Sequence, residues 1–333
     1  MDTTTLGRTG LKVSVAALGA GGNSRLGMRT GATESQAADL VRAAIDRGIN
    51  FIDTAPAYGT ESAVGRAVRD CRDRVILSTK AKPTAPGTNF EGADFVKPGD
   101  IRISVEASLK NLGTDYIDLI HLHGVRQHHY DFSLNALLPE LLRLRDEGKV
   151  RFLGITEAFG TDPDRDVMRR AIGDGVWDVL MLGHNFVNQS AARDLLPLAA
   201  ESNLGVMAMY AVRGALARKD SLAKLIERLM ATGEIDPETV DMADTFSLLL
   251  ESGVSGSLTD VAYRFCRHSP GVNVVLTGTG DLVHLEDNIV AINGAPLPKH
   301  VLHRLSFIFG GVRSATGDIE AFPRQRPFTA PAT

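Results

Sequence analysis

The chain has 333 residues, of which 44% are hydrophobic and 23% charged, as in ordinary globular proteins. A net charge of −4 with scattered Lys and Arg residues argues against a nucleic-acid-binding surface. Two cysteines, Cys71 and Cys266, are too few for a disulfide framework and fit reduced thiols. The first residues lack a secretory signal pattern, and no apolar run approaches the ~20 residues of a membrane helix. We therefore expect a cytoplasmic protein with no membrane or nucleic-acid partner.

The apolar pattern predicts an N-terminal hairpin over 3–13, followed by strands that alternate with helices. The strands are expected at 13–18, 50–53, 75–80, 116–123, 152–156, 179–182, 206–209 and 272–276. The helices are expected at 37–47, 61–69, 100–112, 134–147, 163–172, 191–202, 258–267 and 282–292, with extra helices at 221–232 and 299–309. Loops over 81–99, 124–133 and 210–219 are expected to shape a pocket.

Alternation of strands and helices favours a parallel sheet closed on itself. We therefore predict an α/β fold, a (β/α)8 TIM barrel with an N-terminal hairpin and extra helices, over residues 1–312. Residues 313–333 are predicted to be a C-terminal extension that is partly extended.

Ionisable side chains stand at the ends of three consecutive predicted strands. Asp53 ends one strand, Tyr58 lies in the following loop, Lys80 ends the next strand and His123 the one after. The carboxyl ends of barrel strands form the face on which active sites are built, so these side chains should meet there. His121 has the same strand parity as His123 and should also face inward. It is interpreted as a hydrogen-bonded core histidine, with a supporting role in the site left open.

Four stretches of the sequence resemble those of the aldo-keto reductase family, and the similarity runs from Thr5 to Phe309. They are Gly48-Ile-Asn-Phe-Ile-Asp53-Thr-Ala-x-x-Tyr58-Gly59, Ser78-Thr-Lys80, Leu112-Gly-x-Asp-Tyr-Ile-Asp-Leu-x-x-x-His123 and Gly148-Lys-Val-Arg-x-x-Gly154. The resemblance implies an NAD(P)-dependent oxidoreductase that reduces an aldehyde or ketone, or oxidises an alcohol or sugar.

The four ionisable residues suit carbonyl reduction, which needs a proton at the carbonyl oxygen. Tyr58 would act as the general acid/base, but the reference pKa of tyrosine, ~10, is high for easy transfer at neutral pH. We expect the Lys80 ammonium to lower the pKa of Tyr58, Asp53 to hold Lys80, and His123 to polarise the substrate oxygen. The resemblance assigns the same roles to these positions.

The glycine loop after the first barrel strand is a poor dinucleotide fingerprint, because Ser24 stands where a third glycine is needed. A Rossmann fold is therefore disfavoured, and Gly21 and Gly22 are interpreted as letting the backbone approach a ligand. The family binds a nicotinamide nucleotide across the carboxyl ends of the strands. The positions to which the resemblance assigns this binding are Asp53, Thr156, Glu157, Met181, Tyr210, Gly278, Thr279, Gly280, Leu285, Asp287 and Asn288.

Several of these positions depart from the family pattern. Glu157 replaces an amide and Met181 a glutamine, so their contacts with the carboxamide should differ or be absent. The helix that begins near Leu282 should offer free N–H groups to a phosphate, although Gly278-Thr-Gly280 could also be a simple connecting turn. NADP-specific relatives carry Lys and Arg at the positions of Gly278 and His284. The cofactor is thus NADP or NAD, with relaxed specificity or a preference for NAD, unless Arg213 supplies a replacement cation.

Two other functions stay open at this point. Lys80 could form a Schiff base in a lyase, although a neighbouring Asp53 would keep it protonated. A non-catalytic, nucleotide-binding regulatory subunit is the other alternative, although the intact catalytic set counts against it. His128 and His129 are interpreted as surface residues of a loop, so no metal site is predicted. The expected partner is a small carbonyl compound or sugar, and the sequence specifies neither the natural substrate nor the oligomeric state.

Overall fold

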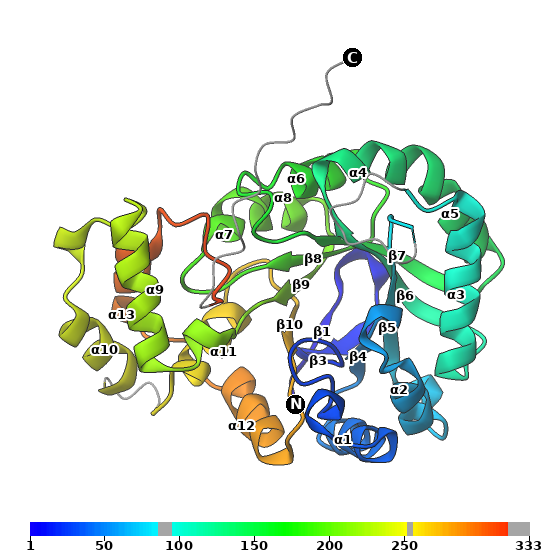
Figure 1. Ribbon diagram of the computed structural model, residues 1–333, viewed down its shortest axis with the longest axis horizontal. Coiled ribbons are helices and arrows are strands. Elements are labelled where there is room, and N and C mark those ends of the chain that lie inside the picture. Colours follow the sequence, from blue (N-terminus) through cyan, green and yellow to red (C-terminus); the bar gives the residue numbers. More distant parts are fainter. Residues whose placement is uncertain (86–94, 252–255, 319–333) are drawn as a thin grey trace.

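The computed structural model describes residues 1–85, 95–251 and 256–318 of the chain, and within them eight parallel strands close into a barrel (Figure 1). The order around the barrel is β10-β3-β4-β5-β6-β7-β8-β9, with each strand beside its sequence neighbour. The predicted TIM barrel is therefore confirmed. The barrel strands are β3 (Ala16–Gly19), β4 (Phe51–Asp53), β5 (Ile76–Ala81), β6 (Ile117–Val125), β7 (Val150–Glu157), β8 (Val179–Gly183), β9 (Gly205–Met209) and β10 (Val274–Thr277).

The predicted hairpin is present and closes one end of the barrel. It pairs β1 (Thr3–Thr5) with β2 (Lys12–Ser14) in antiparallel register. Leu6 and Leu11, between the two strands, join the apolar cluster inside the barrel. Leu6 packs against Gly205, the first residue of β9, where a side chain would lie 2.8 Å from its Cγ. The hairpin therefore covers the amino ends of the strands and leaves the carboxyl ends for the site.

Helices surround the barrel, and a group formed by α9, α10 and α13 stands beside it, at the left of Figure 1. The first helix begins with a capping box, in which Thr33 and Gln36 satisfy each other's backbone N–H groups. The helices are α1 (Glu34–Asp46), α2 (Glu61–Val68), α3 (Pro98–Leu112), α4 (Gln127–Phe132), α5 (Leu138–Asp146), α6 (Asp166–Asp174), α7 (Ser190–Asp194), α8 (Leu196–Glu201), α9 (Lys219–Ala231), α10 (Met242–Glu251), α11 (Leu258–Arg267), α12 (Leu282–Asn293) and α13 (Lys299–Phe309).

Three local predictions are wrong. The expected loop over 124–133 contains α4 followed by a π-helical turn, and His129 is buried in it instead of lying on the surface. The expected helix over 191–202 is divided into α7 and α8, because Pro197 cannot continue the hydrogen-bond ladder of the preceding turn. Helix α10 was not predicted.

Other expectations fall partly outside the described residues. Residues 86–94 of the expected loop over 81–99, and residues 319–333 of the C-terminal extension, lie there. In the part of the chain that the structure describes, none of the helices combines the length and the apolar character required to cross a bilayer.

Candidate active site

Asp53 and Lys80 form a buried ion pair at the carboxyl ends of β4 and β5. The Lys80 ammonium lies 2.8 and 2.6 Å from the two Asp53 oxygens and also donates to the Thr54 carbonyl at 2.8 Å. The two side chains are 1% and 3% exposed, so neither charge could be kept there alone. The pair therefore fixes a positively charged ammonium at the end of the barrel.

Tyr58 and His123 stand next to this ammonium. Tyr58 ends a short 3-10 turn, η3 (Pro56–Tyr58), and its ring centroid lies 5.0 Å from the Lys80 nitrogen. The rings of Tyr58 and His123 meet edge to face with their centroids 5.8 Å apart. Gly21 makes room for this placement, because a Cβ there would come within 2.5 Å of the Tyr58 ring. The structure thus brings all four predicted catalytic residues together.

Strand register extends the cluster one layer deeper. Asp53 is paired with Ser78 across β4 and β5, and Lys80 with His121 across β5 and β6. The Ser78 hydroxyl donates to Asp53 at 2.9 Å and lies 3.2 Å from Nδ1 of His121. His121 is fully buried and covers Gly154, where any side chain would collide with its ring. His121 is thus a buried core histidine whose Nδ1 is linked through Ser78 to the ion pair of Asp53 and Lys80, while its Nε2 has no hydrogen-bond partner among the described residues.

The electrostatics of Tyr58 differ from the expectation. Burial raises the pKa of Tyr58 above that of a free tyrosine, and the charge of Lys80 opposes this effect without overcoming it. The expected net fall in the pKa of Tyr58 is therefore wrong, because desolvation of the phenolate outweighs the neighbouring ammonium. Burial, together with the charges of Lys80 and Lys82, holds the pKa of His123 well below its usual range. At neutral pH the site thus presents a protonated phenol and a neutral imidazole.

The end of β7 is occupied by a second buried ion pair. Arg165 binds both oxygens of Glu157, at 2.9 and 2.8 Å, and the backbone N–H of Gly183 donates to the same carboxylate at 2.9 Å. Both side chains are 1% exposed. Thr156 accepts a hydrogen bond from the N–H of Gly124 at 2.6 Å. The Glu157 carboxylate is therefore engaged by partners within the chain.

Tyr210, the residue after β9, belongs to a connected series of aromatic and ionic contacts. Its ring meets Phe159 edge to face at 5.3 Å, and the Arg213 guanidinium lies 4.5 Å above it. Arg213 in turn forms two hydrogen bonds with Asp318, at 2.9 and 2.8 Å. On the other side, the Arg165 guanidinium stands 4.8 Å from the centroid of Phe159. Tyr210 itself has φ of 64°, which non-glycine residues seldom adopt, so these contacts hold it in place.

The remaining positions assigned to the cofactor lie on β8 and α12 and in the loops after β3 and β10. Met181 and Leu285 are buried in apolar clusters, a Cβ at Gly22 would meet no atom within 4 Å, and Asp287 is exposed. Asn288 donates to the hydroxyl of Thr277 at 2.9 Å. Two N–H groups at the start of α12 are occupied, because the Asp281 carboxylate accepts from those of Val283 and His284 at 2.8 and 3.0 Å.

Comparison with known proteins supports the sequence resemblance over nearly the whole barrel. The model of the "Aldo/keto reductase family" matches residues 17–308. The chain belongs to the aldo/keto reductase family.

Among its relatives, L-galactose dehydrogenase of Arabidopsis thaliana is 30% identical over 296 residues, which cover 86% of each chain. D-threo-aldose 1-dehydrogenase of a Pseudomonas species is 30% identical over 221 residues, which cover 59% of this chain and 65% of that protein. The holo form of aldo-keto reductase AKR11C1 from Bacillus halodurans superposes with a TM-score of 0.71, over 98% of this chain and 100% of that one. At 22% identity, this last similarity shows the fold alone.

Family membership implies an oxidoreductase that acts on a small carbonyl compound with NADH or NADPH. Ser78, Arg165, Phe159 and Asp281, which lie beside the predicted positions, were not predicted from the sequence. Asp281 had a local signal, because an aspartate directly before a helix is a preferred N-cap. The other three had none, since their contacts depend on how the strands and loops pack.

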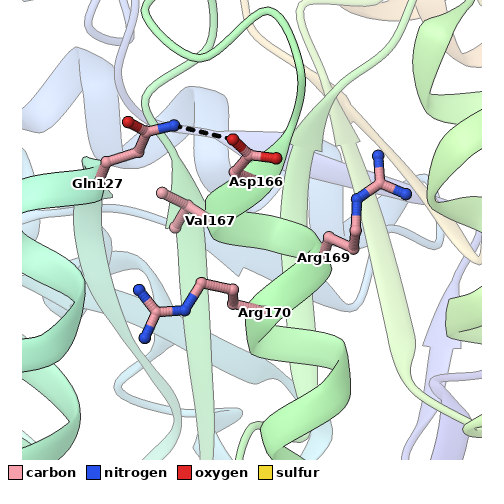
Figure 2. A pocket seen from close by; sticks show the side chains of 5 residues that line it. All are labelled: Gln127, Asp166, Val167, Arg169 and Arg170. Carbon is pink, nitrogen blue, oxygen red and sulfur yellow. Dashed lines mark hydrogen bonds between the residues drawn. The ribbon is translucent and has the colours of Figure 1, made fainter.

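A surface depression of about 360 Å³ lies between α4 and α6. Its lining, drawn in Figure 2, is Gln127, Asp166, Val167, Arg169 and Arg170. Arg170 is already paired with Asp131 at 2.5 Å and stacked 4.6 Å from the Tyr130 ring. None of the residues assigned to catalysis or to the cofactor lines this depression, so it is no part of the candidate active site.

Proposed function

We propose that this aldo-keto reductase catalyses reversible hydride transfer between a nicotinamide nucleotide and a small carbonyl compound or sugar, with Tyr58 as general acid/base. The observation that carries the proposal is the convergence of Tyr58, Lys80, Asp53 and His123 at the carboxyl ends of three strands. In such a cluster a carbonyl oxygen would accept hydrogen bonds from Tyr58 and His123. General acid catalysis of this kind is worth roughly 10²- to 10⁴-fold in rate.

Each residue has a separate task in this scheme. Tyr58 gives its proton to the oxygen during reduction and takes it back during oxidation. Lys80 stabilises the tyrosinate that forms, and Asp53 keeps Lys80 charged and fixed in place. His123, held neutral, donates a hydrogen bond to the oxygen as negative charge develops on it.

The carboxyl ends of β7 to β10 suit a nicotinamide nucleotide. Its chemistry, when bound, is the donation or acceptance of a hydride at the substrate carbon. The half-exposed Tyr210 ring would lie against the nicotinamide, and Gly278, which lacks a side chain, would let the backbone approach the phosphates. The hydroxyl of Thr156 would be available to the carboxamide of the nicotinamide.

The alternative Schiff-base chemistry is disfavoured by the state of Lys80. Although burial lowers the pKa of Lys80, its interactions with Asp53 and Tyr58 raise it by more, so the ammonium stays protonated. A protonated amine is no nucleophile. The alternative of a non-catalytic subunit is disfavoured because the catalytic set is complete and closely packed.

Sugars are the favoured substrate class. Two of the relatives are named for the dehydrogenation of aldoses. A polar substrate also agrees with the composition, which is only 6% aromatic. The oxidised position would be the anomeric carbon, whose hydroxyl would meet Tyr58 and His123.

A substrate panel run with NADH, NADPH and their oxidised forms tests the proposal. It should include simple aldehydes and ketones for reduction, and L-galactose and other aldoses for oxidation. We expect Tyr58→Phe to lose about 10²- to 10⁴-fold in kcat while it keeps its nucleotide affinity, because only the proton carrier is removed. Tyr116→Phe is the matched control, since Tyr116 packs under Arg72 away from the cluster. Unchanged turnover of Tyr58→Phe, or no turnover of any compound by the wild-type protein, would refute the assignment.

A further inference from the structure

His121 is a buried ionisable side chain beside the catalytic residues, and the proposed chemistry does not use it. Its ring lies against Gly154 of β7, where a Cβ would come to 2.3 Å from Cδ2 and 2.6 Å from Nε2 of the imidazole. Because Gly154 has no side chain, the ring occupies this space and turns Nδ1 toward the Ser78 hydroxyl, 3.2 Å away. The glycine that ends the motif over 148–154 thus gives room to one particular orientation of His121.

The single hydrogen of the Ser78 hydroxyl determines the tautomer of His121. An ionised carboxylate can only accept, so this hydrogen is donated to Oδ1 of Asp53 at 2.9 Å. The serine oxygen then accepts its hydrogen bond from Nδ1 of His121, which must carry a proton. In a neutral ring Nε2 is bare, and a proton there would find no acceptor among the described residues. Burial, together with the charges of Lys80 and His123, holds the pKa of His121 well below its usual range, which agrees with a neutral ring.

The same hydrogen bonds connect His121 to the ammonium of Lys80. Oδ1 of Asp53 accepts from both the Ser78 hydroxyl and the Lys80 ammonium, at 2.9 and 2.8 Å. Hydrogen bonds in series polarise one another, so the N–H of His121 makes the Ser78 hydroxyl a stronger donor to the carboxylate. A carboxylate that has this second donor is fixed in place and neutralises the ammonium less completely. Lys80 is then better able to stabilise the tyrosinate of Tyr58.

We propose that His121, as the Nδ1–H tautomer, is a positioning residue for hydride transfer that acts through Ser78 on the ion pair of Asp53 and Lys80. This inference rests on the proposed function and adds His121 and Ser78 to it. In this role His121 neither contacts the substrate nor transfers a proton during turnover. Its loss should therefore lower kcat and leave KM nearly unchanged, because the interaction it supports is made in the transition state.

Nitrogen NMR of the intact wild-type protein, labelled with 15N-histidine, tests the tautomer without any substitution. The resonances of His121 are identified by the contact of its ring with the Cα hydrogens of Gly154. We expect a protonated Nδ1 and a bare Nε2 at neutral pH. A bare Nδ1 would overturn the inference, because Ser78 could then receive no hydrogen bond from His121.

Steady-state kinetics of single and double variants test the positioning role. We expect Ser78→Ala to lower kcat for carbonyl reduction about five- to tenfold, with KM and the nucleotide Kd nearly unchanged, because one hydrogen bond to the carboxylate is lost. His121→Leu should lower kcat about two- to fivefold, and His121→Asn, whose amide can donate from a similar position, should restore part of this loss. The double variant Ser78→Ala, His121→Leu should have the kcat of Ser78→Ala, because His121 acts only through the hydroxyl.

Ser269→Ala is the matched control for the removal of a serine hydroxyl from a buried histidine. Nε2 of His184 lies 2.8 Å from the Ser269 hydroxyl, which donates to the Phe265 carbonyl at 2.9 Å. Among the described residues, this pair shares no hydrogen bond with the catalytic cluster, so Ser269→Ala should leave kcat unchanged.

Three kinetic results would overturn the inference in an active enzyme. They are an unchanged kcat in Ser78→Ala, losses that multiply in the double variant, and an equal loss of kcat in Ser269→Ala. Each of them would leave the proposed function standing. Absence of turnover by the wild-type protein with every compound of the substrate panel would instead refute the proposed function, and the positioning role with it.

Discussion

The two halves of the barrel mouth are built differently. At the ends of β4, β5 and β6, neighbouring strands bring Asp53, Lys80 and His123 together through parallel register. At the ends of β7 to β10, the side chains are held by partners from irregular segments and not from a neighbouring strand, such as Arg165 on Glu157 and Asp318 on Arg213. The first half of the mouth is therefore built by strand register, and the second by contacts from loops and the C-terminal segment.

Breaking the ion pair of Asp53 and Lys80, at the ends of β4 and β5, should have the largest effect on stability and kcat. Lys80→Met leaves the buried Asp53 carboxylate without its cation, so we expect a loss of about 3–5 kcal/mol in the free energy of unfolding. We also expect a fall in kcat of at least 10²-fold, because the tyrosinate loses its stabilising charge. Urea unfolding and steady-state kinetics measure the two losses.

The double variant Asp53→Asn, Lys80→Met separates these effects. It removes both charges, so most of the stability should return while the activity stays lost. Recovery of kcat in the double variant would contradict the role assigned to Lys80.

The corresponding change at the ends of β7 to β10 is Arg165→Met. The Glu157 carboxylate would lose its cation, and we again expect about 3–5 kcal/mol of destabilisation in urea unfolding, part of which Glu157→Gln should restore. The catalytic cluster does not contact Arg165 directly, so kcat should change far less than in Lys80→Met. Equal losses of kcat in the two variants would contradict a division of the mouth into two independently built halves.

A smaller effect, on nucleotide affinity, is expected from weakening the pair of Asp318 and Arg213, the residue that stacks on Tyr210. Asp318→Asn weakens the hold on Arg213, an ion pair whose side chains are 25% and 23% exposed. Such pairs contribute at most about 1 kcal/mol, so the Kd for NADH should rise by roughly two- to fivefold with kcat nearly unchanged. Asp131→Asn, which breaks the exposed pair with Arg170, is the control and should leave the Kd for NADH unaltered. Identical Kd values in all three proteins would show that the Asp318 contact does not position Tyr210.

The difference between the two halves of the mouth also explains which contacts could be predicted from the sequence. The barrel, the hairpin and the cluster of Asp53, Tyr58, Lys80 and His123 follow from the strand pattern, because strand register brings neighbouring strand ends together. The contacts of Glu157 and Arg213 do not, since Arg165 and Asp318 lie in irregular segments whose path the strand pattern does not predict. The shift in the pKa of Tyr58 was predicted with the wrong sign, because its direction depends on burial, which the charges around it in the sequence do not reveal. The helix start of α12, expected to be free, is partly occupied by Asp281, which is visible in the sequence as a cap.

The pH dependence of turnover in both directions tests the account most directly. Because the pKa of Tyr58 is raised, reduction should be nearly independent of pH from about 7 to 10, where both Tyr58 and His123 are neutral. Oxidation needs the tyrosinate, so its kcat should rise about tenfold per pH unit over the same range, and Tyr58→Phe should abolish that rise. Oxidation that is independent of pH, or a pH profile that Tyr58→Phe retains, would contradict Tyr58 as the group that carries the proton.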